Sequence, residues 1–295
     1  MKKLQLHTFL ITLLFSLTLT CFAQVDSWKE ELATWKKERV ERLKKPHGWL
    51  SLIGMEWLHK GENSIGSAKA NDIVLPHGPA LVGVFKLHDN KITFTPKKGV
   101  KINANHKLVN TAIEVKMDSS GEPSVFDIDS FEFYVIERGK PALRIKDSQA
   151  STRKNFTQID YFPATDKFRI EAEFVAYEPN KEIEIINVLG LLNKEKSIGY
   201  VKFSVDGEEF QLDALEAGNE MFIIFSDRTS GRTSYGPGRF LGVPKPKNNS
   251  NQVIIDFNKA YNPPCAFNEY STCPLPPHQN RIRAFIEAGE KIYNY

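Results

Sequence analysis

Arginines, hydroxyl side chains and glycines are concentrated in the segment DRTSGRTSYGPGR, which runs from Asp227 to Arg239. An arginine fork can hold a carboxylate or phosphate through two hydrogen bonds, and glycines let the backbone approach a ligand closely. The segment therefore predicts a site for an anion or polar ligand at Arg228, Arg232 and Arg239. The alternative is a hairpin loop in which Asp227 pairs with an arginine and the glycines serve the turn.

A second segment, from Asp256 to Arg281, combines five prolines with polar side chains. Proline fixes φ and removes a backbone donor, so this segment is predicted to be an ordered loop with a rigid path. Rigid loops that carry polar groups often form binding sites. Its candidate ligand-binding residues are Asn258, Tyr261, Asn262 and Asn280.

Cys265 and Cys273 lie within the same segment. A disulfide between them would close a small loop and stabilise the fold by restricting the unfolded chain. The other interpretations are a zinc pair completed by His278, a reactive or redox-active thiol pair, and two reduced, buried thiols. A structural disulfide is the expectation, and no metal or other cofactor is predicted.

The sequence contains no standard nucleophile, phosphate-loop or zinc-protease motif. An enzyme would therefore have to use other groups. Asp227, Tyr235 and Asp256 are the candidates for acid–base roles of a hydrolase or transferase type.

The N-terminal residues 1–23 have the features of a signal peptide: Lys2 and Lys3, an apolar run over Leu10–Leu19, and a small residue, Ala23, at the predicted cleavage point. The mature protein is predicted to be exported, periplasmic or secreted. Removal of the two lysines changes the net charge from +3 to about +1. This balance gives no electrostatic argument for nucleic acid, and no later stretch is predicted to span a membrane.

Residues 24–46 are predicted to hold a helix over Ser27–Lys45, with Trp28, Leu32, Trp35 and Leu43 on or near one face and Pro46 at its end. The charged residues between them are expected to face solvent.

The rest of the chain alternates apolar and polar residues in short runs separated by Gly, Asn and Pro, which predicts a mainly β fold. We expect an N-terminal β section over 47–121, resembling a sandwich, and a C-terminal antiparallel barrel or sandwich over 122–295. Strands are predicted, among others, over Phe168–Phe174, Lys181–Val188, Met221–Phe225 and Arg281–Ala288, with a hairpin turn at Asp206–Gly207.

The motifs DFNKAYNPPCAF at 256–267, TCPLPP at 272–277, NR at 280–281 and EAGEK at 287–291 resemble domain-of-unknown-function family 1684, a family of uncharacterised exported bacterial proteins. Further matching residues are Trp49, Trp57, Arg144, Asp147 and the DRTSG motif that begins at Asp227. The resemblance implies no activity.

Three functions fit these residues. The first is a binding module for a small polar or anionic ligand at the two loops. The second is an enzyme of hydrolase or transferase type at the same place, and the third is a structural envelope protein stapled by the disulfide.

Overall fold

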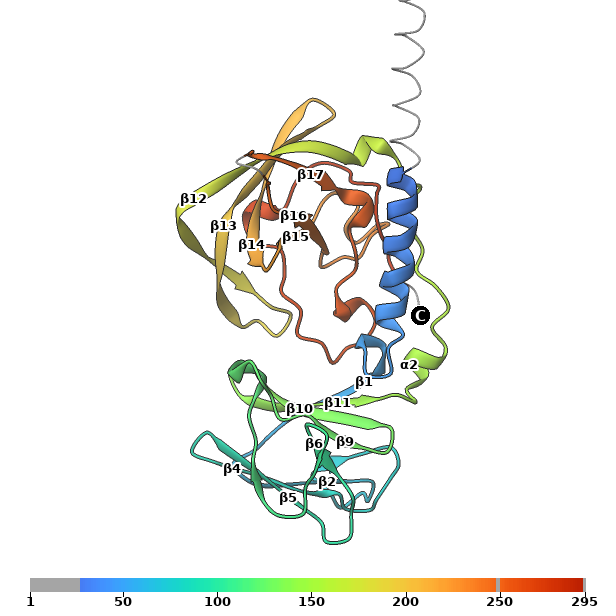
Figure 1. Cartoon of the computed structure of the whole chain (residues 1–295), viewed down its shortest axis with the longest axis vertical. Helices are drawn as coiled ribbons and strands as arrows, with labels where there is room; N and C mark the ends of the chain where they lie inside the picture. Colours follow the sequence, from blue (N-terminus) through green and yellow to red (C-terminus); the bar gives the residue numbers. More distant parts are fainter. Residues whose placement is uncertain (1–26, 248–249, 294–295) are drawn as a thin grey trace, which may run out of the picture.

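The computed structural model describes residues 27–247 and 250–293. The protein is mainly β, with antiparallel sheets and an N-terminal helix, as predicted (Figure 1). The signal peptide predicted at residues 1–23 lies outside the described residues. In the described part of the chain, no helix has the length and apolar character needed to cross a membrane.

The N-terminal helix is described over residues 27–43 and confirms the predicted apolar stripe. Trp28, Leu32 and Leu43 are buried, with exposed fractions of 6%, 2% and 1%. Arg39 lies on the same stripe, because residues three and four positions apart share a helix face, and it is buried to 7% exposure. The helix runs along one side of the C-terminal barrel (Figure 1).

The first β unit packs two sheets face to face. One sheet has the order β1-β11-β10-β9-β6-β7 and the other β3-β2-β4-β5-β8. Their bounds are β1 Leu52–Trp57, β2 Gly61–Gly66, β3 Ile73–Val74, β4 Gly83–His88, β5 Lys91–Pro96, β6 Asn103–Ala104, β7 Lys107–Leu108, β8 Ile113–Glu114, β9 Phe126–Ile128, β10 Phe131–Glu137 and β11 Pro141–Asp147.

Four phenylalanines fill the space between these sheets. Phe85, Phe94, Phe126 and Phe133 are fully buried, and the ring centroids of Phe94 and Phe126 are 4.7 Å apart. Because β9–β11 pair with strands of the first sheet, this unit continues to Asp147. The first β unit therefore ends later in the chain than residue 121, where the sequence suggested a boundary between the two β sections.

The second β unit is one sheet, nearly closed into a barrel, with the order β16-β15-β14-β13-β12-β17. Its strands are β12 Arg169–Ile186, β13 Leu192–Val205, β14 Glu208–Ala217, β15 Glu220–Phe225, β16 Arg239–Pro244 and β17 Gln252–Asp256. Ile170, Ala172 and Phe174 point into its core, as their alternation predicted. Asp206 and Gly207 form the β13–β14 turn with φ of 52° and 84°, which confirms the predicted hairpin.

Short helical turns connect these elements. They are η1 Trp49–Ser51, η2 Asp118–Ser120, α2 Ser151–Lys154, η3 Asp166–Phe168, η4 Phe257–Lys259, η5 Pro264–Ala266 and η6 His278–Asn280.

Two strand predictions were wrong. Lys181–Val188 is not a separate strand, because residues up to Ile186 continue β12 past a bulge between Ala176 and Lys181. Arg281–Ala288 alternates exposed and buried residues but forms no strand. Its first half bonds to the backbone of Ser226 and Arg228, whereas in its second half the Arg239 side chain binds the carbonyls of Ile286 and Ala288.

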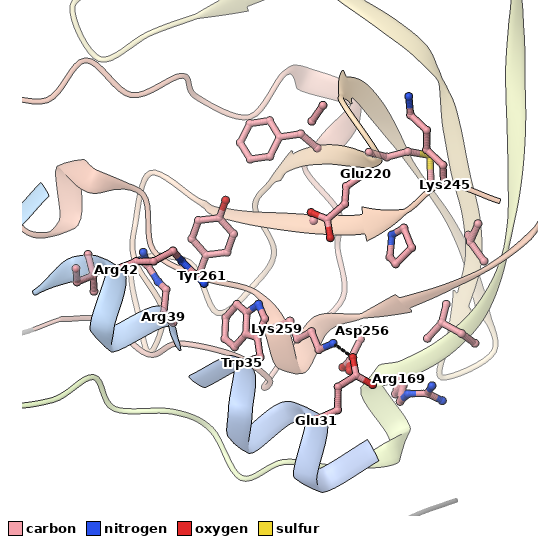
Figure 2. Close-up of a pocket in the computed structure, with 18 of the residues that line it drawn as sticks. Glu31, Trp35, Arg39, Arg42, Arg169, Glu220, Lys245, Asp256, Lys259 and Tyr261 are labelled. Carbon is pink, nitrogen blue, oxygen red and sulfur yellow. Dashed lines mark hydrogen bonds and ion pairs between the residues drawn. The ribbon is translucent and has the colours of Figure 1, made fainter. Parts of the chain in front are cut away.

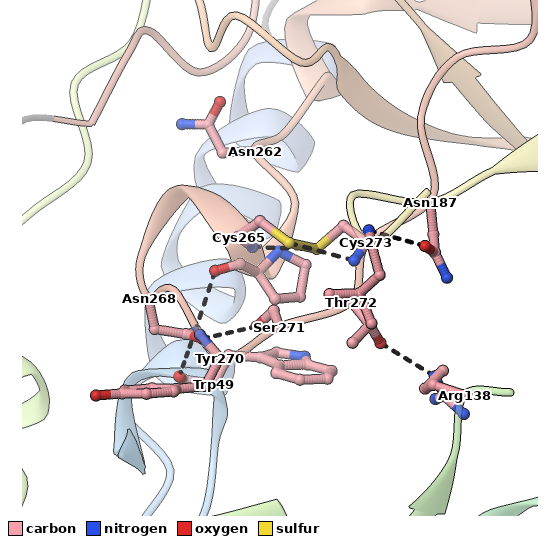
Figure 3. The surroundings of a disulfide bond; sticks show 12 residues. Trp49, Arg138, Asn187, Asn262, Cys265, Asn268, Tyr270, Ser271, Thr272 and Cys273 are labelled. Atoms are coloured by element: carbon pink, nitrogen blue, oxygen red, sulfur yellow. Dashed lines mark hydrogen bonds between the residues drawn. A yellow bond between two sulfur atoms is a disulfide. The ribbon is translucent and has the colours of Figure 1, made fainter. Parts of the chain in front are cut away.

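The cysteines form the predicted disulfide, with Cα atoms 6.1 Å apart (Figure 3). The loop that it closes contacts the first β unit. Thr272 Oγ1 accepts a hydrogen bond from Arg138 Nε at 3.0 Å, and Asn268 Nδ2 donates to the Trp49 carbonyl at 3.1 Å. The bridge therefore stabilises a loop that joins the two β units.

Replacing Cys265 and Cys273 together by alanine should lower the free energy of unfolding by about 2–3 kcal/mol, the loop entropy expected for so short a ring. Chemical denaturation with and without a reductant would measure this. The reductant should weaken the wild type and leave the double variant unchanged. Equal stability of the two oxidised proteins would contradict the prediction.

Candidate functional site

Arg239 and Asp227, both predicted as site residues, form a buried ion pair instead of a ligand site. Arg239 Nη2 lies 2.8 Å from Asp227 Oδ2, and both side chains are fully buried. The same guanidinium donates to the carbonyl oxygens of Ile286 and Ala288. Burial lowers the pKa of Arg239, and the neighbouring Asp227 carboxylate opposes that shift. These contacts use most of the hydrogen-bonding capacity of both side chains, which leaves little for binding a ligand.

A second buried ion pair fastens the N-terminal helix to the C-terminal segment. Arg39 Nε lies 2.8 Å from Glu290 Oε1, with side-chain exposures of 9% and 0%. Glu290 Oε2 also accepts a hydrogen bond from the Asn262 backbone at 2.7 Å. Arg39 donates to the Asn262 carbonyl at 2.8 Å, so three segments meet at one pair of charges.

The three asparagines predicted to bind a ligand bond to the protein itself. Asn258 Nδ2 donates to the Thr165 carbonyl at 2.9 Å, and Asn262 Nδ2 donates to the Lys291 carbonyl at 2.8 Å. Asn280 Nδ2 donates to the Asp213 carbonyl at 2.9 Å. All three are nearly inaccessible, so they hold the loops in place.

Asp256, the second candidate carboxylate, is bonded on both oxygens. Oδ2 accepts from Trp28 Nε1 at 2.9 Å, and Oδ1 accepts from the Asn258 backbone at 3.0 Å. Its position connects the first turn of the helix to the end of β17.

The remaining predicted residues of the segment 227–239 lie in different environments. Arg228 and Arg232 are exposed. Tyr235 is half-buried, and burial raises the pKa of its hydroxyl. The structure therefore separates the loop arginines: Arg239 belongs to the core, and the other two lie on the surface.

A large cleft lies between the N-terminal helix and the outer side of β15, β16 and β17 (Figure 2). Its volume is about 1330 Å³. It follows the seam where the barrel sheet does not close, because β16 pairs with β15 and β17 pairs with β12. Among the sequence-predicted site residues, Asp256 and Tyr261 line this cleft.

Aromatic and aliphatic side chains form the middle of the cleft. Trp35 from the helix and Tyr261 from the proline-rich segment have ring centroids 6.4 Å apart. Phe222, Pro244 and Ile254 line the barrel side. Burial raises the pKa of Tyr261, so its hydroxyl remains protonated and neutral at neutral pH. The middle of the cleft thus offers a mostly uncharged, aromatic surface.

Basic residues outnumber acidic ones around this surface. Eight lysines and arginines line the cleft, against four acidic residues. The acidic residues are Glu31, Glu171, Glu220 and Asp256.

The excess is concentrated where the helix ends, at Arg39, Arg42, Lys45, His47 and Lys146. Glu31, at the other end of the helix, contacts Lys259 directly (Figure 2). Arg42 follows Glu31 by eleven positions, at a rise of about 1.5 Å each, so the basic end lies roughly 16 Å along the helix from Glu31.

The charges at the basic end differ in how far they are neutralised. Arg39 is paired with Glu290, and both Lys146 and His47 lie near Glu132, at 3.1 and 3.3 Å. Among the residues that the structure describes, the carboxylate paired with Arg42 is that of the exposed Glu38, at 3.6 Å. Within the described part of the chain, Lys45 has no carboxylate within 4 Å. Arg42 and Lys45 are therefore the cations most available to an anion.

Sequence reasoning missed Arg39, Arg42 and Lys45, because a run of mixed charges on a helix usually faces solvent. Arg39 had a signal, since it continues the spacing of Trp28, Leu32 and Leu43. Arg42 and Lys45 have no comparable signal in the sequence. Their role depends on how the helix lies against the barrel.

Residues 154–291 match the family described as "Protein of unknown function (DUF1684)". This range contains the motifs that begin at Asp227 and Asp256. The C-terminal part of the chain therefore resembles that family, as its motifs predicted. Trp49, Trp57, Arg144 and Asp147, which entered the same prediction, precede the matched range.

No curated protein matches the sequence. Among solved structures, the chain is similar to an uncharacterised protein of Haloarcula marismortui determined by NMR in solution, at 28% identity and a TM-score of 0.40. The similarity covers 47% of this chain and 78% of that chain.

Glu290→Gln should lower the free energy of unfolding by about 3 kcal/mol or more, because it leaves Arg39 buried without a counter-charge. A double-mutant cycle with Arg39→Met would measure the coupling by chemical denaturation, and the double variant should regain part of the loss. Glu38→Gln, which breaks the exposed pair with Arg42, is the matched control and should change little. Additive effects of the two buried changes would contradict the prediction.

Proposed function

We propose that the protein binds an amphipathic organic anion in the cleft between the N-terminal helix and the barrel seam. The observation that carries this proposal is the polarised lining: an aromatic middle that continues into a basic end. A ligand with an apolar body and one anionic head matches both parts. The proposal keeps the anionic ligand predicted from the sequence and places it at a different site.

The apolar body would lie along Trp35, Phe222 and Tyr261. Removing apolar surface from water contributes roughly 25 cal/mol per Å², and aromatic rings supply large areas with little loss of side-chain freedom. The extent of this aromatic wall, from the helix to the barrel side, supports an elongated ligand instead of a compact one.

The anionic head would lie beside Arg42 and Lys45. Both side chains are exposed, so neither is held by a buried partner. An arginine fork and a lysine ammonium together suit a carboxylate, sulfate or phosphate group. Elsewhere in the cleft the four acidic residues are matched by four basic ones, so the excess positive charge that favours this orientation lies at the end of the helix.

Binding is better supported than hydrolase or transferase chemistry at the predicted carboxylates. Asp227 and Asp256 each accept hydrogen bonds from within the protein, and Asp227 also neutralises a buried arginine. The Asp227 side chain is fully buried, and Asp256 is oriented by Trp28 and Asn258, so both carboxylates serve the protein's own structure.

We also propose that the protein acts outside the cytoplasm. The basic start at Lys2 and Lys3 and the apolar run that follows support export. A structural disulfide is expected in an oxidising compartment. An exported binding protein would meet amphipathic anions at the cell envelope.

Titration with dodecanoate, followed by tryptophan fluorescence, tests the proposed site. The full chain should bind dodecanoate, and Arg42→Glu combined with Lys45→Glu should weaken binding by about tenfold or more. Dodecanol, which has the same chain without the charge, should bind both proteins equally. Trp35→Ala should weaken both ligands, because it removes part of the apolar wall.

Lys37→Glu is the matched control, since Lys37 is exposed on the same helix and does not line the cleft. It should leave dodecanoate binding unchanged. Equal losses in Lys37→Glu and in the Arg42 and Lys45 variant would show a long-range charge effect and refute the assignment of the head group. Lack of saturable dodecanoate binding to the wild type would refute the site.

A further inference from the structure

Two segments lie side by side at the surface of the barrel, and they carry exposed arginines that do not line the cleft. The Ser226 backbone donates to the Asn280 carbonyl at 3.1 Å, and the Ile282 backbone donates to the Ser226 carbonyl at 2.9 Å. The Arg228 backbone donates to the Ala284 carbonyl at 2.9 Å. These bonds fix residues 226–228 parallel to residues 280–285.

Three exposed side chains lie along the second segment. Ile282 and Ile286 are buried, with exposures of 8% and 0%. Arg281, Arg283 and Phe285 are exposed, and Phe285 is 47% accessible despite its size. The chain bends at Arg283 and Ala284, so the three side chains are related by their shared exposure beside residues 226–228 and do not lie along a straight strand.

Arg228 completes the surface from the neighbouring segment. Its guanidinium carbon lies 5.8 Å from the Phe285 ring centroid, a distance typical of a cation–π contact. We call Arg228, Arg281, Arg283 and Phe285 the arginine face. Large exposed apolar side chains combined with arginine are typical of interaction surfaces.

The arginines of this face lack acidic partners. Within the described part of the chain, no carboxylate lies within 4 Å of Arg228, Arg281 or Arg283. Asp227, next to Arg228 in sequence, is fully buried and bonded to Arg239. Arg281 donates to the Pro276 carbonyl at 3.3 Å, which orients its guanidinium and leaves its charge unneutralised.

The backbone beneath the face is held firmly. Asn280 bonds to the carbonyls of Asp213 and Ile224, both at 2.9 Å. Arg239 holds the Ile286 carbonyl at 3.0 Å from below. A partner would meet arginines on a preformed backbone, which reduces the loss of conformational entropy on binding.

We propose that the arginine face binds an extended acidic segment of a partner protein. Side chains at alternate positions of an extended chain are about 6.6–6.8 Å apart, so carboxylates at alternate positions of the partner match Arg281 and Arg283. Phe285 would receive an apolar side chain of the same segment. Glu287, exposed at the next position of this face, would repel a further acidic residue and limit the length of the match.

Fluorescence anisotropy tests this with a labelled peptide in which glutamate alternates with valine and threonine. The full chain should bind this peptide, and binding should weaken as salt rises. Arg283→Glu should reduce the affinity by about tenfold or more, and Phe285→Ser should also reduce it. A peptide of the same composition with its glutamates in one block should bind more weakly, because the alternate spacing is lost.

Lys98→Glu is the control, since Lys98 is exposed in the first β unit and the charge change is the same. It should leave peptide binding unchanged. Equal weakening by Lys98→Glu and Arg283→Glu, or equal binding of the two peptides, would overturn the proposal in favour of non-specific attraction. Stronger binding of inorganic polyphosphate than of the alternating peptide would overturn it in favour of a phosphate ligand. Dodecanoate binding by the Arg283→Glu variant tests the cleft separately.

Discussion

Two arginine–carboxylate pairs inside the C-terminal unit constrain the rest of the structure. Arg239 with Asp227 and Arg39 with Glu290 are removed from water almost completely. A buried charge is tolerated only when its partners and hydrogen bonds are in place. Each pair therefore requires several segments to be positioned together, and the two pairs share the C-terminal segment, whose carbonyls bond to Arg239 and whose Glu290 bonds to Arg39.

This arrangement explains why a cleft exists at all. The barrel sheet stays open between β16 and β17, and the N-terminal helix lies over the opening without filling it. Arg39 and Trp28 hold the helix at two points, through Glu290 and Asp256. Between these points the helix presents Trp35 to the seam. The cleft is thus a consequence of how the helix is fastened, and its basic end is the end of the helix itself.

Much of the fold could be read from local sequence patterns. Alternation predicted the strand around Phe174, a continuous apolar run predicted the strand that ends at Phe225, and the apolar spacing predicted the helix that contains Trp28. The pairing of Cys265 with Cys273 followed from their separation and an expected oxidising environment. Arg281–Ala288 shows the limit of this reasoning, because an alternating segment becomes a strand only if another backbone lies beside it along its length. In the second half of this segment, the Arg239 side chain and not a neighbouring backbone binds the carbonyls of Ile286 and Ala288.

The candidate site could be predicted only in part. Residue type does not distinguish an arginine that binds a ligand from one that neutralises the protein's own carboxylate, and Arg239 is the second kind. Of the residues proposed on the rigid loop, Asp256 and Tyr261 line the cleft. Arg42 and Lys45 were not predicted, because their place in the lining of the cleft depends on the tertiary position of a helix whose surface pattern is ordinary.

The most direct measurement of the central claim is the mass of the intact, folded protein isolated from the cells that produce it, under non-denaturing and denaturing conditions. We expect the folded chain to carry an additional anionic, apolar compound that is released on denaturation. The variant with Arg42→Glu and Lys45→Glu should carry less of it. A folded wild-type protein with the mass of the bare polypeptide would contradict the assignment of the cleft as a ligand site.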